Sequence, residues 1–147
     1  MKYLKSYNES LRDKMTPKSP DDIKRDLMKL SPEDKIVKGT HHNNKDLIIM
    51  GVEEGGDMEV ALRWACQKGD TEMVTTLLDK GVDPNTYLAL GTAVEWGRID
   101  IVKILLRLGA NPHANSNYSF IESDARFGKD SGMSILLRQY SKNTLID

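Results

Sequence analysis

The sequence is short of cysteine and of long apolar runs. Its 147 residues include a single cysteine, Cys66, which cannot form a disulfide within the chain and agrees with a reducing compartment. No stretch reaches the run of about 18 apolar residues that a membrane-spanning helix needs, and residues 1–6 lack the apolar core of a secretory signal. We therefore expect a soluble, cytoplasmic protein with no membrane partner.

An excess of charge of either sign is also lacking. The chain has 21 Lys and Arg side chains against 22 Asp and Glu, a formal net charge of -1. Because nucleic acids attract proteins chiefly through a basic surface, this balance argues against a nucleic-acid partner. With 39% hydrophobic residues, the chain is long enough for one domain with one continuous core.

Residues that carry catalysis or bind cofactors are scarce as well. The chain has 3 histidines, and the adjacent pair His41 and His42 would point about 100° apart on a helix. Without a nearby Cys or further His, a solvated helix end is favoured over a metal site. The pair Gly55 and Gly56 is not followed by the Gly-Lys-Ser/Thr of a phosphate-binding loop. The sequence therefore predicts a protein that is not an enzyme and that needs no metal or other cofactor.

What the sequence does contain is a repeated two-helix pattern. Residues 90–112 read as a short helix, a turn at Gly97, a second helix with an apolar stripe, and an exit that starts at Gly109. The same pattern lies earlier in the chain, with its turn at Gly69 and its exit at Gly81; both exit glycines fit the left-handed residue that ends a helix. A repeating unit of this size is typical of a solenoid, in which each unit covers the apolar face of the next. We expect four units, at residues 33–57, 59–85, 87–115 and 118–140, whose first helices cover Glu33–His42, Val60–Lys68, Leu88–Trp96 and Phe120–Phe127.

Residues 1–30 differ in character and are expected to form a partly helical N-terminal arm, followed by the repeat domain at residues 31–147. The pairs Ser19-Pro20 and Ser31-Pro32 each supply an N-cap and a proline at the first helical position. The helix that starts at Pro20 carries an apolar side, and the terminal units of repeat arrays need a cap for their open edge. The residues expected to form this cap are Ile23, Leu27 and Leu30.

The second and third units resemble ankyrin repeats. Residues 69–85, Gly-Asp-Thr-Glu-Met-Val-Thr-Thr-Leu-Leu-Asp-Lys-Gly-Val-Asp-Pro-Asn, are similar position for position to the second half of that repeat, and residues 97–112 match about as well. The unit starts depart from the family's Thr-Pro-Leu-His, as in Val-Ala-Leu-Arg at residues 60–63. The resemblance implies an all-α solenoid of about four ankyrin-like repeats, with Cys66 as a buried structural thiol facing the neighbouring repeat. A divergent short array behind a polar arm also resembles small bacteriophage and other viral proteins, which would act in the host cytoplasm.

The ankyrin likeness also implies a contact surface for another protein, whose identity is unknown. In that family the two residues before the inter-helix glycine face a concave groove, which here would bring Trp96 and Phe127 together on adjacent repeats. Aromatic side chains with polar neighbours are typical of binding hot spots; the alternative is that Trp96 belongs to the core or is covered by the arm. The groove residues predicted to bind the partner are His42, Lys68, Glu95, Trp96, Arg126 and Phe127, and those at the hairpin tips are Asn85, Thr86, Tyr87, His113, Asn115 and Asn117.

A second function remains open at this point. The arm could be the active part and insert into a sister subunit, with the repeats as a spacer in a structural or assembly protein. The two functions predict different oligomeric states, which the sequence does not decide, although a monomer is slightly favoured.

Overall fold

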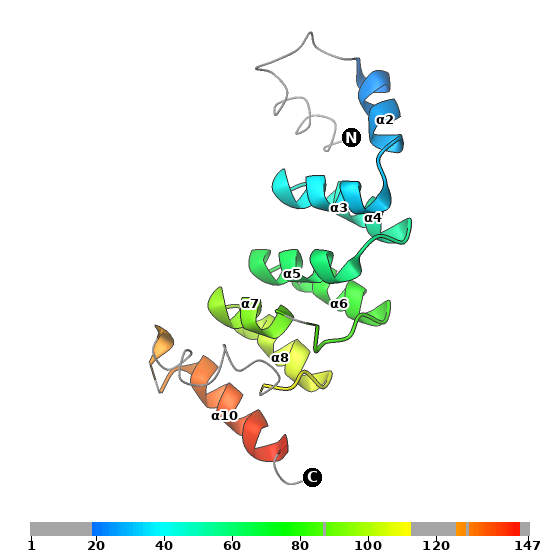
Figure 1. Cartoon of the computed structure of the whole chain (residues 1–147). Coiled ribbons are helices and arrows are strands. Elements are labelled where there is room, and N and C mark those ends of the chain that lie inside the picture. The colour runs from blue at the N-terminus through cyan, green and yellow to red at the C-terminus, as the bar shows by residue number, and fades with distance from the viewer. Residues whose placement is uncertain (1–18, 87, 113–125, 129, 145–147) are drawn as a thin grey trace. The chain divides into compact units, whose positions relative to one another are not determined.

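The structure, a computed structural model, describes residues 19–86, 88–112, 126–128 and 130–144. Within these ranges the regular secondary structure is helical throughout, which confirms the predicted all-α class (Figure 1). Residues 1–18 of the predicted arm and most of the helix predicted at residues 120–127 lie outside the described residues. The helices are α2 (Pro20–Met28), α3 (Pro32–His41), α4 (Lys45–Glu53), α5 (Met58–Lys68), α6 (Thr71–Asp79), α7 (Ala89–Glu95), α8 (Ile99–Arg107) and α10 (Gly132–Thr144).

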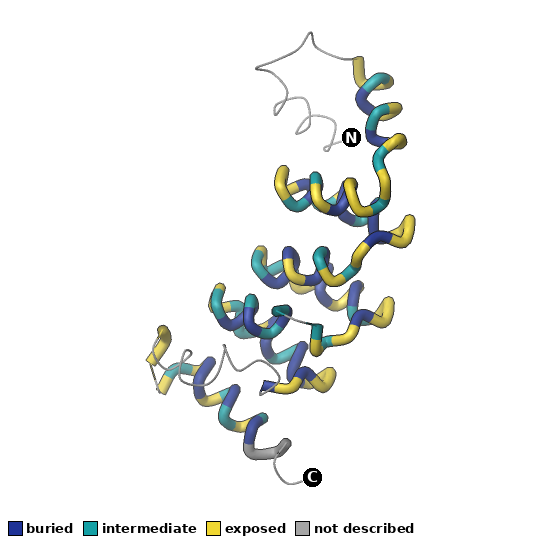
Figure 2. The backbone as a smooth tube through the Cα atoms, in the orientation of Figure 1, coloured by how far each residue is buried: buried dark blue, intermediate teal, exposed yellow. Residues whose placement is uncertain are grey.

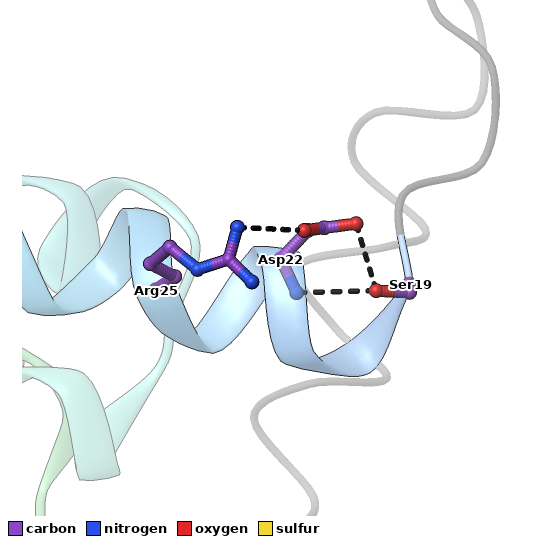
Figure 3. Close-up of polar contacts among 3 residues, drawn as sticks. All are labelled: Ser19, Asp22 and Arg25. Atoms are coloured by element: carbon purple, nitrogen blue, oxygen red, sulfur yellow. Dashed lines mark hydrogen bonds and ion pairs between the residues drawn. The ribbon is translucent and has the colours of Figure 1, made fainter.

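Two serine-proline pairs begin helices, as the sequence predicts. Ser19 caps α2, where its Oγ accepts the backbone N–H of Asp22 at 3.2 Å and donates to the Oδ2 of the same residue at 2.8 Å. Arg25 then pairs with Asp22 Oδ1 at 3.1 Å, so the carboxylate is held on both sides (Figure 3). Ser31 caps α3 through the N–H of Asp34 at 3.1 Å. A cap of this kind satisfies one of the N–H groups that a helix start leaves open.

The chain divides into two compact units, residues 1–61 and 62–147. In the first unit, the arm helix α2 packs against α4 of the first helix pair. Ile23 and Leu27 of α2 are buried in a cluster with Leu47 of α4, and the partly buried Leu30 packs against it. The apolar side of α2 therefore covers part of the first repeat, in the place that the capping prediction gives it. The boundary between an arm at 1–30 and a repeat domain at 31–147 stays a prediction.

Helices α3 and α4 approach each other closely because glycines lie at their contact. A Cβ atom on Gly51 would lie 2.6 Å from the carbonyl oxygen of Pro32, and one on Gly39 would lie 2.9 Å from the backbone nitrogen of Ile48. Any larger residue would push the two helices apart. Next to this contact, the buried Lys35 of α3 forms an ion pair with Glu54, the C-cap residue that follows α4. Removing the carboxylate would leave a buried charge without its partner.

The second unit holds the later helix pairs, and their apolar stripes form its core. Helix α8 contacts α6, α7 and α10, and the turns that follow α6 and α8 are exposed (Figure 2). Burial of these stripes against neighbouring helices is expected to be the main contribution to the stability of a repeat array. The fully buried side chains of this unit include Leu62, Cys66, Val74, Leu77, Ile101, Val102, Leu105 and Ser134.

Left-handed residues recur at the turns, as the repeat pattern predicts. The turns within helix pairs contain Asn43 (φ 54°), Gly69 (φ 79°), Gly97 (φ 67°) and Gly128 (φ 86°). Positive φ is costly for residues with a Cβ, so glycine and asparagine are favoured at such positions. The glycines that end the second helices have the same backbone conformation: Gly55 (φ 93°), Gly81 (φ 96°) and Gly109 (φ 95°).

Several predicted helix ends differ from the observed ones by one or two residues. Helix α7 covers Ala89–Glu95 instead of Leu88–Trp96, because Leu88 has a φ of 129° and Trp96 serves as the C-cap. Helix α5 begins at Met58, two residues early, and Asp57 Oδ1 accepts the N–H of Glu59 at 2.9 Å there. Helix α3 covers Pro32–His41 instead of Glu33–His42. Among the described residues, no helix is long and apolar enough to cross a membrane.

Candidate functional site

Three exposed side chains of the second unit precede the turns within successive helix pairs. Lys68 ends α5, Trp96 caps α7, and Phe127 precedes Gly128. The exposed fraction is 49% for Trp96 and 36% for Phe127, which is large for aromatic side chains. The other tryptophan, Trp64 of α5, is buried. The alternative in which Trp96 belongs to the core is therefore wrong.

The two exposed aromatic residues lie on the same part of the surface. The Cε1 and Cζ atoms of Phe127 would be 3.5 and 3.6 Å from a Cβ placed on Gly97, the residue that directly follows Trp96. The ring of Phe127 therefore covers the turn between α7 and α8. The guanidinium carbon of Arg126 lies 5.9 Å from the centre of the Phe127 ring, within the range of a cation–π interaction.

A second cation is fixed beside Lys68. Arg98 Nε and Nη2 both donate to the carbonyl oxygen of Gln67, at 3.3 and 3.2 Å. This carbonyl belongs to the last turn of α5, where such groups lack helical partners. The same guanidinium lies 3.1 to 3.2 Å from the position of a Cβ on Gly69. Arg98 thus ties the start of α8 to the end of α5 and places its charge next to the residue before Gly69, which is Lys68.

These contacts join residues at the turns of successive helix pairs, here named the basic aromatic strip: Lys68, Arg98, Trp96, Phe127 and Arg126. Each of these residues contacts a neighbouring repeat or lies next in sequence to a residue that takes part in such a contact. The half-buried Glu95 precedes Trp96 and adds a carboxylate beside the strip. All of these residues belong to the second unit.

Comparison with known proteins assigns the repeats to a family. The model of the family described as "Ankyrin repeats (3 copies)" matches residues 34–116, more than half of the chain. The chain belongs to the ankyrin-repeat family. The match covers the first three predicted units and ends before the fourth. Ankyrin repeats are generally protein–protein interaction modules, and the family is typically non-catalytic.

One curated ankyrin-containing relative is an enzyme. The "2-5A-dependent ribonuclease" of Mus musculus is 47% identical over 55 residues, which cover 33% of this ankyrin-repeat chain and 8% of the ribonuclease. The chain thus spans a small fraction of that relative, so the likeness does not bring the ribonuclease activity with it. No solved structure matches the chain. A viral or bacteriophage origin stays a prediction.

The structure also locates the remaining residues predicted to bind a partner. His42 is exposed in the first unit, and Thr86 is half-buried in the turn after α6. Asn85 is exposed, but its side chain forms two hydrogen bonds to the backbone of the next turn, to Gly109 and Asn111. A contact between these residues and a partner stays a prediction. Tyr87, His113, Asn115 and Asn117 lie outside the described residues.

The single cysteine of the chain, Cys66, lies in the core. Cys66 is fully buried, and burial raises the pKa of its thiol to about 12. A neutral buried thiol is a poor nucleophile, and the burial predicted for Cys66 is confirmed. In the part of the chain that the structure describes, no group of three or more His, Cys, Asp and Glu residues could hold a metal ion.

Two hydrogen-bonded contacts between repeats were not predicted from the sequence. Arg98 and Asn85 both use polar side chains to join consecutive ankyrin repeats. The signal for Asn85 was its place at the end of the Gly-Val-Asp-Pro-Asn turn, where an amide can satisfy backbone groups. For Arg98 no local signal exists, since its acceptor Gln67 lies in the preceding repeat.

Proposed function

We propose that this ankyrin-repeat chain is a non-enzymatic protein-binding module and that the basic aromatic strip is its contact surface in the second unit. The observation that carries the proposal is the joint exposure of Trp96 and Phe127 next to a cation stacked on one of the rings. Trp, Tyr and Arg are the residues most enriched in binding hot spots. A folded chain gains little by leaving two large aromatic rings in water, so their exposure supports a partner that covers them.

The hairpin tips and His42, which the sequence also predicts to contact the partner, would enlarge this contact surface. A cytoplasmic setting, in a host cell if the chain is viral, belongs to the same proposal. Its mechanism is sequestration or displacement through surface complementarity, with no bond made or broken.

The test is an affinity pull-down from the source cell with the full chain. Trp96→Ala combined with Phe127→Ala removes both rings and should abolish capture of the partner, while the melting temperature stays close to that of the wild type. Leu108→Ala is the matched control, because Leu108 is 53% exposed at the end of α8 and lies outside the strip. Normal capture by the double variant, with an intact melt, would place the binding surface elsewhere.

The second function, assembly through the arm, has less support. Ile23 and Leu27 are buried against Leu47 within the same chain, so these residues are not available to a sister subunit. An assembly role would then depend on residues 1–18, which lie outside the described residues. Size-exclusion mass of the chain with and without residues 1–30 separates the two functions, since only the assembly role predicts an oligomer that is lost on deletion.

A further inference from the structure

We propose that the basic aromatic strip recognises an acidic segment of its partner that carries a large apolar side chain. The inference rests on the protein-binding function proposed above and specifies the chemistry of the partner. The strip holds three cations, Lys68 and Arg98 at the end of α5 and Arg126 beside the Phe127 ring, whereas the chain as a whole has a net charge of -1. The positive charge is therefore local to the strip and is not a consequence of composition.

Two of the three cations are held in place before any partner arrives. Arg98 is fixed by two hydrogen bonds to the Gln67 carbonyl, and Arg126 lies over the ring of Phe127. Ordering a long side chain on binding costs about 0.5 to 1.5 kcal/mol, so prior fixation lowers the cost of each contact with a carboxylate. A guanidinium also binds a carboxylate through two parallel hydrogen bonds.

The apolar part of the strip lies between these charges. Gly97 separates Trp96 from the ring of Phe127 and is itself exposed. Because glycine has no side chain, the Phe127 ring can pack against the turn directly after Trp96, and the two aromatic residues together form the surface that an apolar group of a partner would contact. The geometry thus favours a partner whose apolar residue is flanked by carboxylates on both sides.

A nucleic acid is the other polymer that combines negative charge with flat apolar groups. Binding to single strands requires a positive groove that follows the phosphates. The half-buried Glu95 directly precedes Trp96, in the repeat between those that carry Lys68 and Arg126, and a carboxylate there would repel a continuous phosphate backbone bound along the strip. Glu95 is compatible with a peptide, whose charges are discrete and can be spaced around it.

The experiment selects binders from a random peptide library displayed on phage against the full chain. Peptides that also bind the Trp96→Ala, Phe127→Ala variant are removed. Enriched sequences should contain an excess of Asp and Glu around one large apolar residue. Enrichment of neutral or basic sequences, or no enrichment relative to the double variant, would overturn the inference. A pull-down in which the partner still depends on Trp96 and Phe127 would then leave the proposed function standing by itself.

A binding titration with one enriched peptide, labelled with a fluorophore, tests the role of charge. Lys68→Gln and Arg126→Gln should each weaken binding by about threefold to tenfold and reduce its salt dependence. Lys103→Gln is the control, since Lys103 is a half-exposed lysine of α8 that pairs with Asp100 at 3.6 Å. Equal losses in all three variants would contradict a specific role for the strip. Tighter binding of a labelled single-stranded oligonucleotide than of the peptide would instead identify a nucleic-acid site.

Discussion

The side chain of Asn85 joins two consecutive repeats through the backbone of Asn111. Its Oδ1 accepts the Asn111 N–H at 2.7 Å, and its Nδ2 donates to the carbonyl oxygen of Gly109 at 3.2 Å. Asn85 follows α6 and its two partners follow α8. One amide therefore fixes the spacing of two turns that are far apart in the sequence.

The first prediction concerns this link. Asn85→Ala removes both hydrogen bonds and should lower the free energy of unfolding by about 1 to 2 kcal/mol, since an intramolecular hydrogen bond contributes about 0.5 to 1.5 kcal/mol. Asn85→Asp keeps the acceptor and loses the donor, so its loss should be smaller. Urea unfolding followed by circular dichroism measures both. An alanine variant as stable as the wild type would mean that the turns keep their spacing without this side chain.

The second prediction concerns the stacking core. Leu105→Ala, in the central helix α8, should cost about 2 to 5 kcal/mol, as buried leucines do. Leu137→Ala in α10 should cost less, because a terminal unit has a neighbour on one side only. Leu108→Ala is the control, since that side chain is 53% exposed and should change stability by less than about 1 kcal/mol. Equal losses at Leu105 and Leu137 in a melting series would contradict this order of repeats.

Local signals in the sequence predicted the elements of the fold and their turns. Ser19-Pro20 and Ser31-Pro32 begin helices because a serine oxygen and a fixed proline φ are properties of the dipeptide itself. The chain reverses with a positive φ at Gly97 and Gly109. Glycine is favoured at both positions because residues with a Cβ resist that conformation. Such features depend on neighbours in the sequence, so periodicity was enough to find them.

Contacts between repeats could not be predicted in the same way. Nothing near Lys35 indicates that a lysine would be buried with Glu54 as its partner, because the pairing depends on how closely α3 and α4 pack. The strip was predicted in part: the repeat register placed Trp96 and Phe127 before the inter-helix glycines but left their exposure open, whereas the link from Arg98 to Gln67 depends on the distance between two helix ends.

The third prediction concerns the arm helix. Leu27→Ala should lower the stability of the first unit by about 2 to 5 kcal/mol, because Leu27 is buried against Leu47. The adjacent Met28 is 63% exposed, so Met28→Ala is a matched control on the same helix and should have little effect. Deletion of residues 1–30 should lower the melting temperature. An unchanged melting temperature after that deletion would show that α2 does not cap the repeats.

The fourth prediction is a pH dependence that arises from Cys66. Burial raises the pKa of its thiol from 9.0 to about 12 in the folded chain. Between these values the folded state keeps the proton while the unfolded state loses it, so stability should fall as pH rises from about 9 to about 12. Cys66→Ala should show a shallower fall over the same range. Unfolding midpoints of both proteins at a series of pH values measure the difference, and parallel curves would mean that the thiol ionises equally in both states.

The last prediction separates effects on the association rate from effects on the dissociation rate at the proposed surface. Glu95→Lys and Arg126→Glu change charges beside the exposed rings, and charges at the edge of an interface mainly alter the association rate and its salt dependence. For a partner with an acidic segment, Glu95→Lys should speed association and Arg126→Glu should slow it, with both effects shrinking as salt is raised. Removing the ring of Trp96 should instead speed dissociation, because most differences in affinity between related complexes lie in the dissociation rate. Surface plasmon resonance with the captured partner measures both rates, and a thermal melt of each variant confirms that the fold is intact. If Glu95→Lys slowed association and Arg126→Glu sped it, the partner would present basic residues to this surface.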